Sequence, residues 1–535
     1  MKTVLLNSKP PFWIDIMEKH EEVTLNRVKK NSLILMVFTF ISRVLGILRA
    51  RVVANYFGAS GVGDVINFTF NIPNNFRKLF AEGAFNSAFI PVFTRLVVSR
   101  ERQKQLLRTL FGFQIVIMAP IIIGTYFFRV EIIMLFSDFT EVELILLASR
   151  LLSIFMVYLA LISLYALLIG VLQSHNLFFI ASVSPLLFSL TVIGSIILFY
   201  QQLGPYSMAL GVILGGIFQI AFTFMRVKSL HYDSHISFKF SNSDFIDVMR
   251  RWMPVTFSAL ITIASQQVAF YFASTLKTGS VSYFSNAIII WQAPYGIFFG
   301  AIATSIFPSL VQASSNVNKK FMKELTTHGL ISLFALLIPS LLLLTLYGKQ
   351  TSVVLFESGK YSLLDALNTS EVLFYFAISM PIAAWYTFLQ RVSYAIDDYK
   401  PSLIVASIVA VVDIFSTILL LRIRGEASSI AIASIISFSL GLLMFLFYLD
   451  KKDVLSVRDT SFITKIVKIT LANIPLFIYL YIMNFLCTPV YFTQIGTLLS
   501  FTILSGIYLG AIIITFIVYN IAHIELITLF KKKRG

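Results

Sequence analysis

The sequence has few of the residues that soluble enzymes use for catalysis and for contact with water. Only 13% of its 535 residues are charged, against roughly 25% in a typical soluble domain. It has six histidines and a single cysteine, Cys487. One cysteine excludes a disulfide within the chain and a thiolate metal site. Because no polar stretch is long enough to form a soluble domain, the composition excludes a soluble multidomain enzyme.

The chain is instead rich in long hydrophobic segments. Hydrophobic residues make up 57% of it, and phenylalanine alone supplies 52 residues. A helix needs roughly 20 mainly apolar residues to cross a bilayer, and about fourteen such segments follow one another along the chain. The sequence therefore predicts an all-α polytopic membrane protein. Residues 1–30 are polar, lack the apolar core of a cleavable signal, and are predicted to be a cytoplasmic extension.

The distribution of positive charge predicts the orientation in the membrane. Alternate connections between spans, beginning with the N-terminal segment, hold most of the 42 lysines and arginines. We expect a multi-pass protein of the cytoplasmic (inner) membrane. Under the positive-inside rule, both of its termini lie in the cytoplasm. The net charge is +16, but the basic residues that produce it are scattered over short loops. We therefore expect contact with anionic lipid in the bilayer and no nucleic acid partner. The basic tail at 531–534 either contacts lipid or is a solvated end.

An internal repeat divides the chain. Pro73 and Pro294 lie 221 residues apart, and the same offset superposes the segment from Gly170 on the segment from Arg391. Repeats with an even number of spans are parallel, so we expect two six-helix lobes related by a pseudo-two-fold axis along the membrane normal, followed by two extra C-terminal helices. The predicted organisation is an N-terminal extension at 1–30, an N-lobe at 31–230, a C-lobe at 231–450, and two further spans with a basic tail at 451–535.

The first two spans carry charges that an apolar helix should not have. A cation at the bilayer centre costs about 2.5–3.5 kcal/mol or more, so it normally faces a protein-lined or watery cavity. Arginine makes forked, charge-assisted hydrogen bonds to phosphate, which favours an anionic substrate. The alternative is that these charges pair between helices, that Asp64 caps the second span, and that Arg51 extends to the membrane surface. The residues predicted to contact the substrate are Arg43, Arg49, Asp64, Arg77, Glu82, Asn71 and Asn74.

Pro73 lies among three asparagines, which predicts a broken helix whose unwound backbone meets a ligand or acts as a hinge. A kinked packing helix is the alternative. The corresponding part of the second copy has uncharged amides, so we expect the cationic part of a site to lie mostly in the N-lobe.

Other chemistry is weakly indicated. His231 and His235 have helical ligand spacing but lie in a charged loop without a glutamate between them, so we predict no metal site. The sequence has no nucleophile elbow and no P-loop, which indicates a transporter without a cofactor and not an enzyme. Its driving force would then be an ion gradient, the membrane potential or the substrate gradient. Asp413, with Thr417 one turn later, is a candidate cation site or proton relay, or a hydrogen-bonded structural acid.

Five segments together carry a resemblance to a known family. They are SRVLGILRARVVANYFGAS (Ser42–Ser60), IPNNFRKLFAEGAFNSAFIPVF (Ile72–Phe93, preceded by Asp64), PYGIFFGAIATSIFPSL (Pro294–Leu310), LFESGKYS (Leu355–Ser362) and YAIDDYKP (Tyr394–Pro401). This set resembles the signature of the MurJ (MviN) lipid II flippases, bacterial members of the multidrug/oligosaccharidyl-lipid/polysaccharide exporter superfamily. The resemblance covers essentially the whole chain.

The resemblance implies a fourteen-helix fold that translocates lipid II, the undecaprenyl-pyrophosphate-linked disaccharide-pentapeptide, for peptidoglycan synthesis. It implies that the last two spans border a groove for the polyprenyl tail. The residues that it places at cavity positions are Arg43, Arg49, Asp64, Arg77 and Glu82. It also implies a monomer with lipid II, the phospholipid bilayer and cell-wall synthesis enzymes as partners.

The chain departs from the family pattern in three places. Ala50 stands where the family usually has aspartate, and the stretch Ser285–Gln292, where a basic residue is common, is uncharged. The seventh span lacks the acid of a sodium site described in some members, although Asp413 and Thr417 match part of that site. The nearest rival function is a flippase for another polyprenyl-linked oligosaccharide. A drug exporter, an intramembrane enzyme and a scaffold for cell-wall synthesis are further alternatives.

Overall fold

The computed structural model describes residues 38, 40–80, 84–175, 177–232, 235–315, 318–455 and 460–524. Within these ranges the chain is helical, and its only extended pairing is an isolated bridge between Ser358 and Tyr361. The predicted all-α class is confirmed. The N-terminal extension, Glu82 and the basic tail lie outside the described residues.

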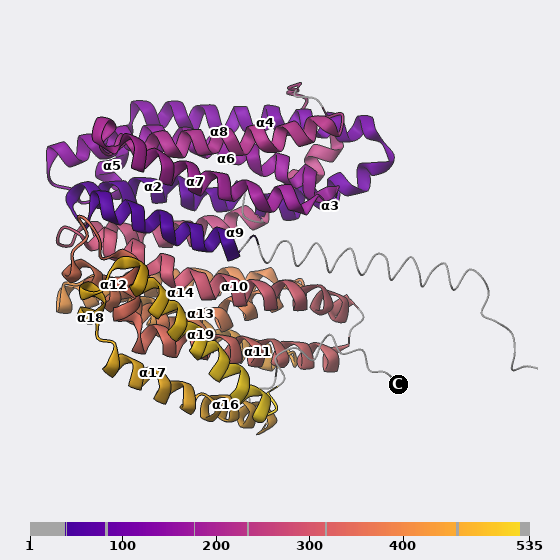
Figure 1. The fold of residues 1–535 in the computed structure, drawn as a ribbon. Helices are drawn as coiled ribbons and strands as arrows, with labels where there is room; N and C mark the ends of the chain where they lie inside the picture. The colour runs from indigo at the N-terminus through magenta and orange to yellow at the C-terminus, as the bar shows by residue number, and fades with distance from the viewer. Residues whose placement is uncertain are drawn as a thin grey trace, which may run out of the picture.

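The first half of the chain forms one group of helices, which is indigo to magenta in Figure 1. It begins with a helix over residues 40–57. The elements that follow are α2 (Gly61–Phe80), α3 (Ala84–Arg95), the short 3-10 helix η1 (Leu96–Val98), α4 (Arg100–Phe127), the short α5 (Arg129–Phe136), α6 (Val142–Ser174), α7 (Phe178–Leu203) and α8 (Tyr206–Ser229).

The second half forms a second group, with further helices on its outer side (Figure 1). Its elements are α9 (Ser243–Ser274), α10 (Ser280–Ser315), α11 (Lys319–Leu346), the short α12 (Gly348–Phe356), α13 (Leu363–Ala395), α14 (Tyr399–Arg424) and α15 (Ser428–Lys451). The last elements are α16 (Thr460–Ala472), α17 (Ile474–Leu486), α18 (Pro489–Gln494) and α19 (Thr497–Ile521), which pack on α11 and α12.

Eleven helices of the described chain are long and apolar enough to cross a membrane, with α16 and α17 forming one of them. The other three predicted spans correspond to residues 40–57, to α2 with α3, and to α9, which is apolar only over Ala259–Ser274. These three carry polar and charged side chains, so composition alone does not identify them. The arrangement is consistent with the predicted count of about fourteen.

The helix α9 lies between the two groups in Figure 1. It packs against α2 and α3 on the N-lobe side and against α10 and α14 on the C-lobe side. Trp252 of α9 donates a hydrogen bond from its indole nitrogen to the carbonyl of Leu79 at 3.3 Å. The two groups are therefore joined through α9 as well as by direct contacts.

The expected break at Pro73 is wrong, because α2 runs without interruption from Gly61 to Phe80. Proline removes one backbone donor and crowds the preceding turn, which can kink a helix without ending it. The preceding turn is also supported by Thr69, whose hydroxyl donates to the carbonyl of Val65 at 2.7 Å. The alternative of a packed helix with an internal proline fits the structure.

Candidate functional site

Arg49 points into the interior of the N-lobe, where it meets aromatic rings. Its guanidinium carbon lies 5.5 Å from the ring centre of Phe70 and 5.3 Å from that of Phe188. The Phe188 ring in turn stacks on Tyr158, with 5.0 Å between ring centres. Cation–π contacts of this kind stabilise a cation by about 0.5–2 kcal/mol and fix its position. Arg49 is therefore held on the N-lobe helices.

A second cation lies near the first. Arg77 of α2 and Tyr158 of α6 are close enough to Arg49 to interact with it electrostatically, and Tyr165 of α6 is similarly close to Arg77. Both tyrosines are buried. The site thus combines two guanidinium groups with two phenol groups. Sequence reasoning found the arginines but missed the tyrosines, whose seven-residue spacing on α6 places them on one helix face.

Arg43 reaches from the first helix to the C-lobe. One of its terminal nitrogens lies 2.8 Å from the position that a Cβ atom on Gly296 of α10 would take. Any larger residue at this position would collide with the guanidinium. Arg43 itself is exposed, so its guanidinium is not enclosed in a packed core.

Arg51 of the first helix binds the end of a helix in the second half of the chain, and the alternative that it extends to the membrane surface stays a prediction. Its Nη1 donates to the carbonyls of Val354 at 2.6 Å and Leu355 at 2.9 Å, which belong to the last turn of α12. The guanidinium also lies over the ring of Phe501 in α19, 5.0 Å from its centre. The last carbonyls of a helix lack partners within the helix and carry partial negative charge, so a cation there is favourable.

Asp64 binds the start of a helix in the opposite lobe. Its Oδ2 accepts from the amide of Gly279 at 2.6 Å, and its Oδ1 accepts from the amide of Ser282 at 2.8 Å and from that residue's hydroxyl at 2.7 Å. The residue is only 4% exposed. A carboxylate at a helix N-terminus satisfies free amides and complements the helix dipole. Asp64 therefore caps α10 and not its own helix.

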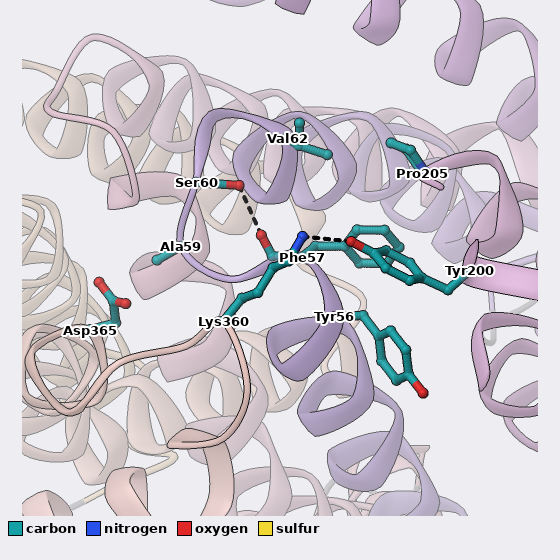
Figure 2. Close-up of a pocket in the computed structure, with 9 residues that line it drawn as sticks. All are labelled: Tyr56, Phe57, Ala59, Ser60, Val62, Tyr200, Pro205, Lys360 and Asp365. Carbon is teal, nitrogen blue, oxygen red and sulfur yellow. Dashed lines mark hydrogen bonds between the residues drawn. The ribbon is translucent and has the colours of Figure 1, made fainter. Parts of the chain in front are cut away.

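A cavity of about 470 Å³ lies beside this junction and is shown in Figure 2. Lys360 crosses it from the C-lobe, and its Nζ donates to the Tyr200 hydroxyl at 2.6 Å. The backbone amide of Lys360 also donates to the carbonyl of Asn55 at 3.0 Å. Gly58 turns the chain here with φ of +68°, and a Cβ atom on it would lie 2.6 Å from the Lys360 carbonyl oxygen. Both lobes therefore approach closely at this end.

The C-lobe contributes a cation that was named from the sequence only as the start of a repeated segment. Arg391 of α13 is half-buried, and its guanidinium lies 4.9 Å from the ring centre of Phe299 on α10. Phe299 continues a stack formed with Trp291 and Tyr295, and the Tyr295 hydroxyl donates to Thr387 at 3.2 Å. The four-residue spacing of these aromatic residues on one helix is the signal that could have revealed the stack.

Asp413 is engaged by a neighbouring helix. Its Oδ1 accepts a hydrogen bond from the Ser437 hydroxyl of α15 at 2.9 Å, and Thr417 is buried one turn away. Among the described residues, no group of three or more histidine, cysteine or acidic side chains is placed to hold a metal ion. The cation site at Asp413 stays a prediction. Asn71 and Asn74 are half-buried on α2, and the role predicted for them also stays a prediction.

A family model described as lipid II flippase MurJ matches residues 53–506. This chain belongs to the MurJ family of lipid II flippases. It is 32% identical to a probable lipid II flippase MurJ of Borreliella burgdorferi, over 80% of this chain and 85% of that protein. The relative from Aquifex aeolicus is 32% identical over 68% of this chain and 72% of its own length. The family resemblance of the sequence is confirmed.

Solved structures extend the likeness to the fold. A MurJ structure described as lipid II flippase MurJ in an inward closed conformation shares 25% identity, with a TM-score of 0.74, over 92% of this chain and 98% of that one. An inward-facing multidrug resistance MATE transporter of the MOP superfamily is 14% identical, with a TM-score of 0.65, over 77% of this chain and 94% of its own. The MATE likeness concerns the fold alone.

Proposed function

We propose that this membrane protein moves lipid II from the cytoplasmic to the outer leaflet by alternating access, with the diphosphate held by arginines of the N-lobe. The observation that carries the proposal is the closeness of Arg49 and Arg77 within one lobe. The family's description and the names of the relatives support lipid II as the substrate.

The electrostatics favour a ligand with several negative charges. Two guanidinium groups repel each other, and repulsion grows where surrounding helices exclude water. An anion between them offsets this repulsion, and a diphosphate can accept forked hydrogen bonds from both. Phe70 and Phe188 hold Arg49 in place before a ligand arrives, which reduces the entropy lost on binding. Arg43, exposed between the lobes, is placed to meet the same headgroup from the cytoplasmic side.

Asp64 and Arg51 support the alternating-access part of the proposal. Each binds the end of a helix in the opposite lobe, Asp64 at the start of α10 and Arg51 at the end of α12. If both chain ends are cytoplasmic, this junction faces outward, and the protein is closed on that side. Opening outward requires these hydrogen bonds to break together, while the two lobes rock about the central cavity. Asp64 then acts in transport through this junction.

The last helices supply an apolar surface suited to a polyprenyl tail. Large hydrophobic side chains of α17 and α19 are highly exposed, including Phe485 at 82% and Leu498 at 84%. Such a surface is stable in a bilayer or under a lipid chain. Each buried CH₂ group of a tail contributes about 0.8 kcal/mol. We therefore infer that the tail lies along these helices while the headgroup enters the cavity.

Depletion of the protein in its host tests the transported substrate. Lipid II should accumulate in the cytoplasmic leaflet, as measured by its protection from a membrane-impermeant enzyme added from outside. Unchanged access to lipid II after depletion would contradict the proposal. The second candidate, a flippase for another polyprenyl-linked oligosaccharide, shares the diphosphate chemistry. It predicts that the other lipid-linked sugar accumulates while lipid II does not.

A further inference from the structure

A small cavity of about 200 Å³ lies where α11, α16 and the end of α19 meet, far along the chain from the charged first helices. Its lining combines two kinds of residue. The polar part consists of Lys465 and Lys468 of α16, His328 of α11 and His523, which follows α19. Isoleucines of the same three segments complete the lining. Among the residues described around this cavity, none is acidic.

The two lysines share one face of α16. Lys465, Lys468 and Ile469 are spaced by three and four residues, so their side chains lie together on the helix. Ile469 is buried, with 1% of its surface exposed, and anchors this face against the neighbouring helices. The lysines themselves are exposed, so their ammonium groups stand at the rim of the cavity. The packing therefore fixes the helix face but leaves the cations free to meet a ligand.

His523 is fixed by the way α19 ends. The residue has φ of +44°, in the left-handed region that non-glycine residues seldom adopt. The next amide, that of Ile524, donates back to the carbonyl of Tyr519 at 2.9 Å and closes the helix end. Tyr519 is in turn tied to α11, because its hydroxyl donates to the Ala335 carbonyl at 2.8 Å. The turn that carries the imidazole is therefore held against α11 and α16.

We propose that this cavity binds the phosphate group of a membrane lipid with net negative charge. Two ammonium groups and the imidazole of His523 supply donors for the phosphate oxygens, and the isoleucines suit the first carbons beyond the phosphate. In Figure 1, α16 and α19 lie on the outer side of the C-lobe, where a lipid in the bilayer can reach the cavity. With the predicted orientation, the cavity opens at the cytoplasmic leaflet, which holds the anionic lipids that attract lysines.

The phosphate can come from a phospholipid or from a polyprenyl diphosphate, and both place the charged group at the membrane surface. The proposal does not depend on what the central cavity transports. It concerns a separate site, assembled from α11 of the C-lobe and from α16 and the end of α19, which follow the internal repeat. It is tested by binding and not by transport.

Binding to the purified full-length protein in detergent tests the proposal. The probes are dihexanoyl phosphatidylglycerol, dihexanoyl phosphatidylcholine, farnesyl diphosphate and inorganic phosphate, each titrated by its effect on the melting temperature. The test variant is the double substitution Lys465→Gln and Lys468→Gln, which removes both positive charges and keeps a polar, unbranched stem of slightly shorter length at each position. The matched control is Lys319→Gln with Lys320→Gln, because these lysines are exposed on α11 outside the cavity.

We expect the test variant to bind phosphatidylglycerol, farnesyl diphosphate or both on the order of tenfold more weakly than the wild type, with the control unchanged. A loss confined to one of these probes identifies the source of the phosphate. Phosphatidylcholine should bind weakly to all three proteins. The proposal is overturned if inorganic phosphate binds as tightly as the lipids, or if the test variant keeps every affinity. When Arg49→Ala is added to the wild type and to the Lys465/Lys468 variant, the difference in affinity between them should remain. A failure of the lipid-binding proposal can therefore be told apart from a failure of the transport proposal.

Discussion

Asp64 of α2 and Ser282 of α10 are joined by two hydrogen bonds, because one carboxylate oxygen accepts from the amide at 2.8 Å and from the hydroxyl at 2.7 Å. The two residues belong to opposite lobes. A single buried acid thus connects the lobes beside the cavity of about 470 Å³, because it complements the dipole at the start of a helix in the other lobe. This contact gives the closed junction a chemical basis that substitution can test.

Replacing Asp64 by asparagine should favour opening of this junction. The amide keeps the size of the side chain but loses the charge at the helix start and one accepting oxygen, a loss of about 1–3 kcal/mol. A cysteine placed at Val62, which lines the adjacent cavity, should then react at least fivefold faster with a water-soluble reagent, in a background where Cys487 is replaced by serine. Asp138→Asn is the control, because Asp138 is exposed. Equal rates in both variants would refute the role of Asp64 in closure.

Gly296→Ala should impair transport by displacing Arg43. The added methyl group would lie 2.8 Å from a guanidinium nitrogen, so the arginine must move. We expect transport to slow several-fold while the melting temperature changes little, since arginine is flexible and the helix tolerates alanine. Gly300→Ala, one turn later, is the matched control because, apart from its chain neighbours and the backbone of its own helix, no atom lies within 4 Å of its Cβ position. A similar effect of both substitutions would show that the helix and not Arg43 is responsible.

The turn after α6 should make stability depend on pH. Burial, together with the charge of Arg100, lowers the pKa of His175 below its ordinary value of about 6.5. The folded protein therefore keeps this histidine neutral where the unfolded chain begins to protonate it. The contribution of neutral His175 to the free energy of unfolding is complete above about pH 6.5, and it is lost as the pH falls toward the lowered pKa.

The measurement is the melting temperature of wild type and His175→Gln between pH 7.5 and 5. The wild type should lose more of its melting temperature than the variant over this range. The Nε2 atom of His175 lies 2.9 Å from the Tyr232 hydroxyl, so the variant keeps a polar partner there. Parallel curves for the two proteins would contradict the assignment.

Orientation is predicted from the basic residues and can be tested with tags. Tags at residue 4 and after Gly535 should be cytoplasmic, whereas tags within 57–64 or 348–364 should be accessible from outside. The reason is the excess of lysine and arginine in alternate connections. If the two chain ends face opposite sides, the even number of spans is wrong, and so is the assignment of the closed junction to the outer face.

The sequence predicted the fold class and the anomalous charges because both depend on local patterns. A cation in an apolar stretch is visible without a structure, and Arg43, Arg49 and Arg77 were found in this way. Their partners were not predictable, since they depend on contacts between distant segments. Arg51 meets carbonyls more than 300 residues away, and Asp64 meets Ser282 across the lobes.

The errors have the same origin. The helix break expected at Pro73 follows from local chemistry, but packing on both sides keeps α2 continuous. Arg391 was not predicted as a site residue, and it lies four residues before the end of its helix. Only the structure shows that it faces the aromatic stack of α10.

The most direct test of the central claim is lipid II transport by the purified protein in proteoliposomes. Wild type, Arg49→Ala and Arg77→Ala are compared, with Arg150→Ala as the control because that residue is exposed on α6 of the same lobe. Each charge-assisted hydrogen bond to phosphate contributes about 1.5–3 kcal/mol, so either alanine variant should transport at least tenfold more slowly while remaining folded. Lysine at either position should restore transport only in part, because it lacks the fork. Wild-type rates in both alanine variants would contradict the claim that these arginines hold the diphosphate.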